Sequence, residues 1–323
     1  MNDLYFVFQN SLIFIIPLLV VALGGMFSEK SGVINIALEG IMIIGAFFGI
    51  LFINAMQSAG RFADNPQLLL ILASLVSIVS GIIYSALLAF ASINMKANQV
   101  IGGTALNLLA PALVVFIART TTDVKQIYFD PIFRVREVPL LSKIPIIGDL
   151  FFKNAYLTTL IGIIILIVAT IVLYKTRFGL RLSACGEHPQ AAASVGVNVY
   201  SMRWSGVLIS GALAGLGGLI YVVPTTVSFA GDVGGYGFLA LAVMIFGQWK
   251  PIRIFFSAIF FGFFKALSST YIVFTFITDL NIPNIDYVFK MIPFIATMVA
   301  LAFASKKSRA PKAEGIPYDP GAR

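Results

Sequence analysis

Residues 181–200 read RLSACGEHPQAAASVGVNVY and form a polar interruption between two long apolar segments. Proline suits the first helical position because its missing N–H has no partner there, and glycine suits the left-handed residue that ends a helix. The interruption therefore predicts a short helix that begins at Pro189 and ends at Gly196. Such a helix carries the small side chains of residues 190–194. It either docks into a groove of another protein or simply links two spans.

The composition limits the class of protein. Of 323 residues, 59% are hydrophobic and only 11% are charged, and the mean hydropathy is +0.95. We therefore expect an all-α polytopic integral membrane protein, with about 8–10 transmembrane helices in one domain over residues 1–304. Lys175, Arg177 and Arg181 place the loop 175–203 in the cytoplasm. The net charge of +8 is thus an orientation signal and does not indicate nucleic-acid binding.

Residues that carry chemistry are few. Cys185 is the single cysteine and His188 the single histidine. They cannot supply an internal disulfide, a His-rich metal site or a Ser-His-Asp site. No phosphate-binding GxxxxGK[ST] loop occurs. We expect no catalytic residue, metal or cofactor, so that if ATP drives this protein, another chain hydrolyses it. An integral membrane enzyme acting on lipid fits poorly for the same reasons.

The apolar segments set the topology. The first covers residues 11–27, and its amino-terminal flank holds Asp3 but no lysine or arginine. It lacks the basic region of a signal peptide and is expected to stay in the membrane. Nine apolar segments followed by a basic cytoplasmic tail, residues 305–323, predict an amino terminus outside, whereas a miscount at the broken segment would reverse this orientation. This tail is expected to be disordered.

One segment breaks the pattern. Residues 224–237 read PTTVSFAGDVGGYG, and the apolar run 238–246 is too short to span a membrane alone. Non-helical backbone at membrane depth is tolerated only against protein or a water-filled cavity. The segment is either a broken or re-entrant helix that lines a pathway, or an outside loop followed by a short helix.

Five polar side chains lie in or at the edge of predicted spans: Asn35, Glu39, Gln99, Asn107 and Lys265. Asn35 and Glu39 are four residues apart and share a helical face, whereas Gln99 and Asn107 lie about 80° apart around their helix. An ionisable group in lipid must face protein or water, so Glu39 and Lys265 are candidate pathway residues and candidate partners. The alternative is that these groups only fasten helices together.

Three stretches resemble a known family. They read GVINIALEGIMIIGAF over residues 32–47, GEHPQAAASVGV and SGALAGLGG within residues 186–218, and GYGFLALAVMIFGQWKP over residues 235–251. The chain is similar over residues 13–304 to the permease subunits of bacterial ABC importers in the branched-chain amino acid and ribose group. It most closely resembles the nucleoside branch of that group.

The resemblance implies a multi-pass permease in the bacterial cytoplasmic membrane that moves nucleosides. Its implied partners are an ABC ATPase subunit, a second homologous permease and an extracellular substrate-binding lipoprotein. The resemblance also implies that the ATPase docks on Gly186, Glu187, Pro189, Ala191, Ala192 and Gly196. Two alternatives stay open: an ABC permease for a sugar such as ribose or for amino acids, and an ion-coupled secondary transporter in which Glu39 and Lys265 form the switch.

Overall fold

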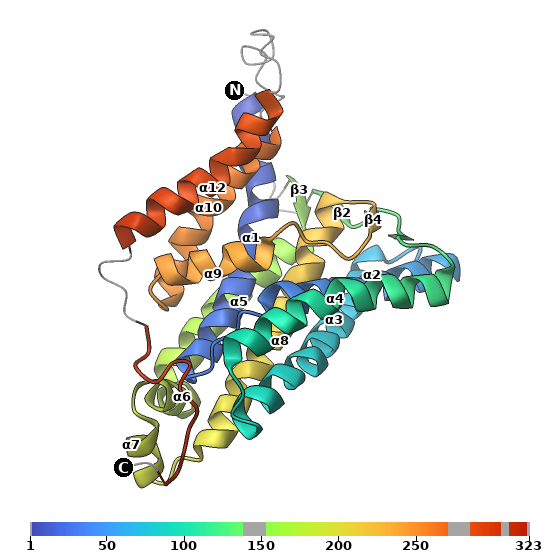
Figure 1. Cartoon of the computed structure of the whole chain (residues 1–323). Helices are drawn as coiled ribbons and strands as arrows, with labels where there is room; N and C mark the ends of the chain where they lie inside the picture. The colour runs from blue at the N-terminus through green and yellow to red at the C-terminus, as the bar shows by residue number, and fades with distance from the viewer. Residues whose placement is uncertain (1, 138–152, 271–284, 305–309, 322–323) are drawn as a thin grey trace.

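The computed structural model describes residues 2–137, 153–270, 285–304 and 310–321, which form an all-α membrane protein (Figure 1). Seven helices within these residues are long and apolar enough to cross a membrane. They belong to α1 (Asn2–Lys30), α2 (Leu38–Ser58), α3 (Pro66–Ala89), α4 (Gln99–Thr122), α5 (Leu157–Lys175), α8 (Val199–Thr225) and α10 (Pro251–Thr270). The 20-residue α12 (Ile285–Ala304) packs against α10.

Shorter elements connect these helices. A π-helical turn, η1 (Phe90–Asn94), extends α3, and α6 (Arg177–Glu187) and α7 (Pro189–Ser194) join α5 to α8. Two antiparallel strand pairs lie between the helices: β1 (Ile127–Tyr128) pairs with β4 (Ser228–Phe229), and β2 (Arg134–Glu137) pairs with β3 (Lys153–Tyr156). These strands are too short to change the fold class.

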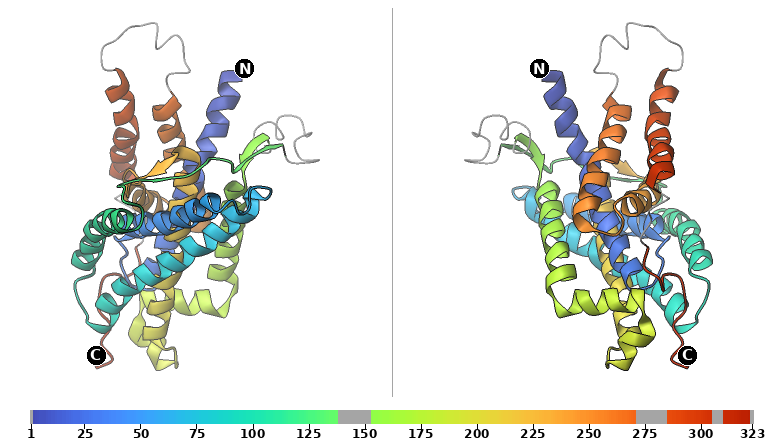
Figure 2. Two further views of the ribbon diagram at one scale, coloured as in Figure 1. Left: turned by 90° about the vertical axis from the view of Figure 1, so that its right-hand side faces the viewer. Right: turned by 90° about the vertical axis from the view of Figure 1, so that its left-hand side faces the viewer.

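The two ends of the chain lie at opposite ends of the molecule. The start of α1 is at one end, and α6, α7 and the carboxyl terminus are at the other (Figures 1 and 2). Since Lys175, Arg177 and Arg181 place the α6–α7 end in the cytoplasm, the amino terminus lies outside. This agrees with the orientation that the sequence predicts.

Helix α8 is the centre of the fold, because α1, α2 and α3 all pack on it. Glycines make these crossings possible. A Cβ atom on Gly215 would overlap the backbone oxygen of Ser77 on α3, and one on Gly45 of α2 would overlap Gly215 itself. The helix backbones therefore touch directly, and in lipid such close packing replaces the hydrophobic effect as a source of association.

The segment that breaks the sequence pattern contains a half-length helix. Pro224 and Thr225 still belong to α8, a loop with β4 follows, and α9 (Tyr236–Phe246) then runs for 11 residues. At 1.5 Å per residue α9 is about 16 Å long, roughly half of the hydrocarbon core. Its first turn packs on buried Glu39 of α2. Of the alternatives, a broken helix that begins inside the protein fits best.

The carboxyl-terminal tail is ordered over residues 310–321, which corrects the prediction of disorder for this part. The Ala313 N–H donates to the Gly186 carbonyl at 2.8 Å, and the Gly315 N–H donates to the Gly32 carbonyl at 3.1 Å. Composition could not reveal this docking, because backbone groups supply these contacts. The rest of the tail, residues 305–309 and 322–323, lies outside the described residues.

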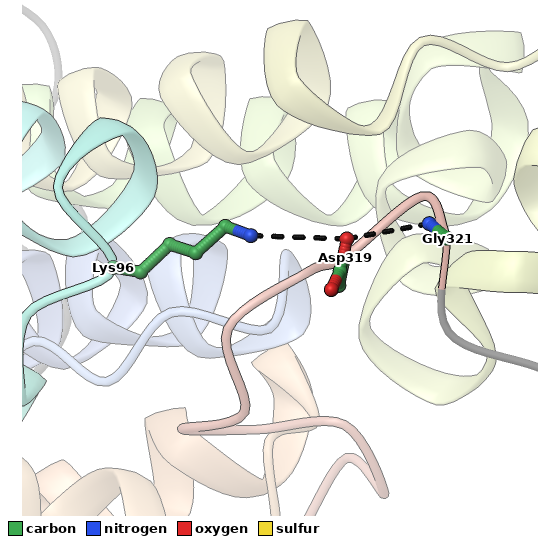
Figure 3. A network of polar contacts seen from close by, with 3 residues as sticks. All are labelled: Lys96, Asp319 and Gly321. Carbon is green, nitrogen blue, oxygen red and sulfur yellow. Dashed lines mark hydrogen bonds and ion pairs between the residues drawn. The ribbon is translucent and has the colours of Figure 1, made fainter.

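Side chains add to the docking of the tail. The buried guanidinium of Arg203 donates from Nη1 to the Ile316 carbonyl at 2.8 Å. Further along, Lys96 Nζ lies 3.8 Å from Asp319 Oδ1, and the Gly321 N–H donates to the same oxygen (Figure 3). The Lys96–Asp319 pair is exposed and contributes at most about 1 kcal/mol. Docking therefore depends mainly on Arg203 and the backbone bonds.

A pair of carboxyl groups makes tail docking sensitive to pH. Glu314 of the tail hydrogen-bonds Glu29 at the end of α1, and burial raises the pKa of Glu314 above 4.5. The Trp249 indole N–H donates to Glu29 Oε2 at 2.6 Å. Because two adjacent carboxyl groups cannot both ionise at low cost, the docked tail holds a proton that the released tail loses.

We therefore expect the tail to dock most firmly at low pH, and to loosen as pH rises from 4.5 through the raised pKa of Glu314. Hydrogen exchange of residues 310–321, corrected for the intrinsic pH dependence of exchange, measures this. Protection should fall as pH rises above 4.5 in the wild type, and it should fall less in Glu314→Gln, whose side chain at this position stays neutral. Equal pH dependence in both proteins would contradict this assignment.

Candidate coupling surface and transport pathway

The residues at the helix ends determine where the cytoplasmic helices α6 and α7 begin and end. The hydroxyl of Thr176 accepts a hydrogen bond from the Gly179 N–H and caps α6. Pro189 opens α7, which ends at Ser194, and Gly196 follows with φ 85°. That left-handed conformation favours glycine and turns the chain toward α8. The short helix therefore lies where its proline and glycine predict.

Only half of the predicted ATPase contacts are on the surface. Glu187, Ala191 and Gly196 are exposed. In contrast, Gly186, Pro189 and Ala192 are buried: a Cβ on Gly186 would overlap the Lys30 carbonyl, and Ala192 is 4% exposed in a cluster with Cys185 and Val199. A partner chain cannot touch these three residues directly, so they hold the loop in shape.

The exposed face of α7 includes residues that the sequence did not single out. Gln190 and Ser194 are exposed on the helix, and Val195 is 78% exposed at its end. These residues adjoin the exposed Ala191, so a partner chain that reaches Ala191 would also meet them. Helical periodicity applied to residues 189–196 could have separated this face from the buried one.

The predicted pathway amides fasten the link between α1 and α2. The Asn35 side-chain amide donates to the Ser210 hydroxyl of α8 at 2.8 Å, and Asn35 is fully buried. Gln99 Oε1 accepts from the Ile34 N–H at 2.7 Å. The link, residues 31–37, is not helical, so its backbone groups need such partners inside a membrane protein.

Asn107 does the same at the start of α2. Its side-chain oxygen accepts from the Gly40 N–H at 2.7 Å, and its amide donates to the Ile36 carbonyl at 2.9 Å. Together with Asn35 and Gln99 it favours the alternative in which these groups join helices, and none of the three lines the polar cavity described below.

Glu39 fastens α2 to the half-length α9. Its carboxylate accepts hydrogen bonds from the Gly235 N–H at 2.8 Å and the Gly237 N–H at 2.5 Å. These N–H groups belong to the first turn of α9, where the helix dipole favours a negative charge. The described residues include no ion pair between Glu39 and Lys265, so the partnership predicted for them is wrong.

We expect Glu39→Ala to lower the free energy of unfolding by about 2–3 kcal/mol, because two buried N–H groups lose a charged acceptor. Glu39→Gln should lower the free energy of unfolding less, because its amide oxygen can still accept one hydrogen bond. Thermal unfolding of the purified chain measures the change, with Glu187→Ala, an exposed glutamate, as the matched control. A Glu39→Ala chain as stable as the control would show that Glu39 does not hold α2 and α9 together.

Lys265 lies apart from the other predicted pathway residues. It borders a cavity of about 550 Å³ between the outer parts of α1, α8 and α10. Its Nζ lies 5.9 Å from the ring centre of Tyr236, which is stacked on Tyr221 at 4.0 Å. A second cavity, about 630 Å³ between α2, α3 and α4, is lined almost entirely by apolar side chains. The Lys265 cavity is therefore the better candidate for a polar solute.

The fold and these sites define a class of protein. The described residues hold no cluster of groups that could bind a metal, and they present a helix with an exposed face on the cytoplasmic side of a helical membrane domain. Such a chain is a polytopic helical membrane protein with a candidate docking helix on its cytoplasmic side.

The chain belongs to the family described as branched-chain amino acid transport system / permease component, which its residues 7–298 match. It is 41% identical to the nucleoside ABC transporter permease protein NupC of Lactococcus lactis, over 98% of each chain. It is 40% identical to the guanosine ABC transporter permease protein NupQ of Bacillus subtilis, over 97% of this chain and 96% of that one.

A more distant relative carries a different name. The putative glucose ABC transporter permease protein TsgC13 of Haloferax volcanii is 31% identical over 77% of this chain and 73% of its own length. No solved structure matches the chain significantly. Its membership of the ABC permease family therefore rests on sequence, as the resemblance implied.

Proposed function

We propose that this chain is the permease subunit of an ATP-driven importer that carries nucleosides across the cytoplasmic membrane. The observation that carries the proposal is identity of about 40% over nearly the whole chain with two permeases named for nucleosides and guanosine. The relative named for glucose is both less similar and matched over less of the chain. A nucleoside is therefore favoured over a sugar as the solute.

Three partners follow from this proposal. An ABC ATPase docks on the exposed surface at α7, formed by Gln190, Ala191 and Ser194 of α7, Val195 at its end and Glu187 at the end of α6. A second permease chain supplies the other half of the pore, and an external lipoprotein delivers the nucleoside. When the ATPase pair closes, it pushes on α7, and the buried Ala192 and Gly186 pass this movement to α8 and to the end of α1.

The structure supports the ATP-driven alternative over an ion-coupled one. In the ion-coupled alternative Glu39 is the switch, and a switch residue must gain and lose its partner at low cost. Glu39 instead satisfies two N–H groups of α9 and makes no ion pair with Lys265 among the described residues. Protonating it would leave those groups without their charged acceptor.

Uptake by cells tests the substrate directly. A strain that lacks this chain should take up labelled guanosine more slowly, and expression of the chain should restore the rate. Excess unlabelled nucleoside should compete, whereas ribose and branched-chain amino acids should not. Restoration of ribose or amino acid uptake, with none of guanosine, would reject the proposed substrate but keep the family assignment.

A further inference from the structure

We propose that the Lys265 cavity is the site where the permease holds its nucleoside, and that it favours a 6-oxopurine such as guanine. This inference rests on the proposed function and names the site and the base class. In this assignment the base stacks on the aromatic side chains, the 6-oxopurine edge faces Lys265, and the ribose faces the hydroxyl groups at the ends of α8 and α10.

The size and position of the cavity fit a nucleoside. Its volume of about 550 Å³ lies within the range of small-molecule sites, about 300–1,000 Å³. Its lining residues belong to the first half of α1 and the last turns of α8 and α10, and the start of α1 lies at the end of the molecule away from α6 and α7 (Figure 2). A solute released by an external protein would reach this part of the permease first.

Aromatic rings supply a surface for the base. Phe14 of α1 and Tyr221 of α8 both line the cavity. Tyr221 already stacks on Tyr236, at 4.0 Å between ring centres and 30° between planes, and Phe14 lies 6.5 Å from Tyr236. A base that packs on Tyr221 therefore extends an existing stack, and stacking accepts any base because every base has a π face.

Lys265 supplies the preference between bases. Its ammonium group donates hydrogen bonds and accepts none. Among the described residues it makes no ion pair, and it lies over the ring of Tyr236, at the wall of the cavity. Guanine presents two neighbouring acceptors, O6 and N7, to such a donor, whereas adenine places an N–H₂ donor beside its N7. The cation therefore favours the 6-oxopurine.

The hydroxyl groups of the cavity complement a sugar. Thr225 donates its proton to the Tyr221 carbonyl at 2.6 Å, and Thr270 donates to the Ala266 carbonyl at 2.8 Å. Ser269 likewise donates to its own helix, at 3.1 Å. Because these protons are already used, the oxygens are left as acceptors, and ribose hydroxyls are donors that can use them. The cavity thus offers acceptors to the ribose and a donor to the base.

Photolabelling of the complex of permease and ATPase in nanodiscs tests this site. 8-Azidoguanosine, which keeps O6 and N7, should label peptides that contain Phe14 or Tyr221. Guanosine should compete about tenfold better than adenosine. In Lys265→Met that preference should disappear, whereas Lys265→Arg, which keeps a donor, and Lys125→Met, which removes an exposed lysine outside the cavity, should keep it.

A second pair of variants keeps the test decisive if Lys265→Met does not fold. Tyr221→Leu should weaken labelling about tenfold for every nucleoside, whereas Tyr221→Phe, which keeps the ring, should not. Guanosine uptake by cells with labelling elsewhere in the chain, or with an unchanged preference in Lys265→Met, would overturn the cavity assignment alone. If the proposed function itself were wrong, the result would differ, because no nucleoside uptake would then depend on this chain.

Discussion

An Ala191→Arg variant should fold and reach the membrane but lose ATP-driven uptake. Ala191 is exposed on α7, so an arginine there points at the partner and leaves the membrane domain undisturbed. In the docked complex this bulky cation must be buried without a designed partner, which costs about 3–5 kcal/mol. That corresponds to at least about a hundredfold loss of affinity between permease and ATPase. Co-purification of the ATPase, measured with nucleoside uptake, tests the expectation.

Two further arginine variants give this experiment its controls. Ala59→Arg places the same side chain on an exposed alanine at the end of α2, outside α6 and α7, and should leave both readouts unchanged. Ala192→Arg changes the neighbouring but buried residue, so it should reduce the amount of folded protein. An Ala191→Arg chain that binds the ATPase and transports normally would remove α7 from the coupling surface.

The second large effect is expected in the membrane core, at Gly215 of α8. A Cβ atom there would overlap the backbone oxygen of Ser77 and would lie 3.0 Å from the Gly81 Cα. Both are backbone atoms of α3, which cannot move aside cheaply, so the helices must separate. We expect Gly215→Ala to lower the free energy of unfolding by about 2–4 kcal/mol, seen as a lower melting temperature.

Gly102→Ala is the matched control for this substitution. Gly102 lies in α4, and the nearest atom to a Cβ there is Leu88 Cδ1 at 3.9 Å. Both substitutions gain about 1 kcal/mol of helix propensity, so the difference between them isolates the steric cost at the crossing. If Gly215→Ala melts no lower than Gly102→Ala, then α8 and α3 do not pack as closely as the structure indicates.

The fold and the short helix α7 could be predicted because their signals are local. Long apolar runs identify membrane spans, and Pro189 and Gly196 bound α7 by their own backbone preferences. The half-length α9 was also visible, since a short apolar run after a glycine-rich stretch cannot span a membrane. Which side of α7 faces outward could be seen only in the structure. There Gly186, Pro189 and Ala192, predicted to be on the surface, are buried.

The pathway residues could not be identified from polarity, because a buried polar group has two uses that look the same in a sequence. Asn35, Gln99 and Asn107 satisfy backbone groups of the non-helical link before α2, and Glu39 satisfies those of α9. These partners are up to 198 residues away along the chain. Lys265, in contrast, borders the polar cavity, and its place on a transport pathway stays a prediction.

The ordered tail was missed for a related reason. Its prolines and glycines resemble those of a disordered segment, but Ala313 and Gly315 pair with backbone groups of α6 and of the link before α2. Gly32, whose φ is 94°, is one of these partners, and a side chain there would meet Arg203. Packing of this kind depends on the whole fold and leaves no periodic signal in the sequence.

The central claim is that ATP hydrolysis by a partner chain drives solute movement through this one. To test it, the chain is purified from its native membrane together with the chains bound to it, and the complex is sealed into liposomes with the external binding protein. We predict guanosine uptake that requires ATP on the α7 side, is unaffected by an uncoupler and is lost in Ala191→Arg. Uptake by this chain alone, indifferent to ATP and abolished by the uncoupler, would contradict the claim and make it an ion-coupled transporter.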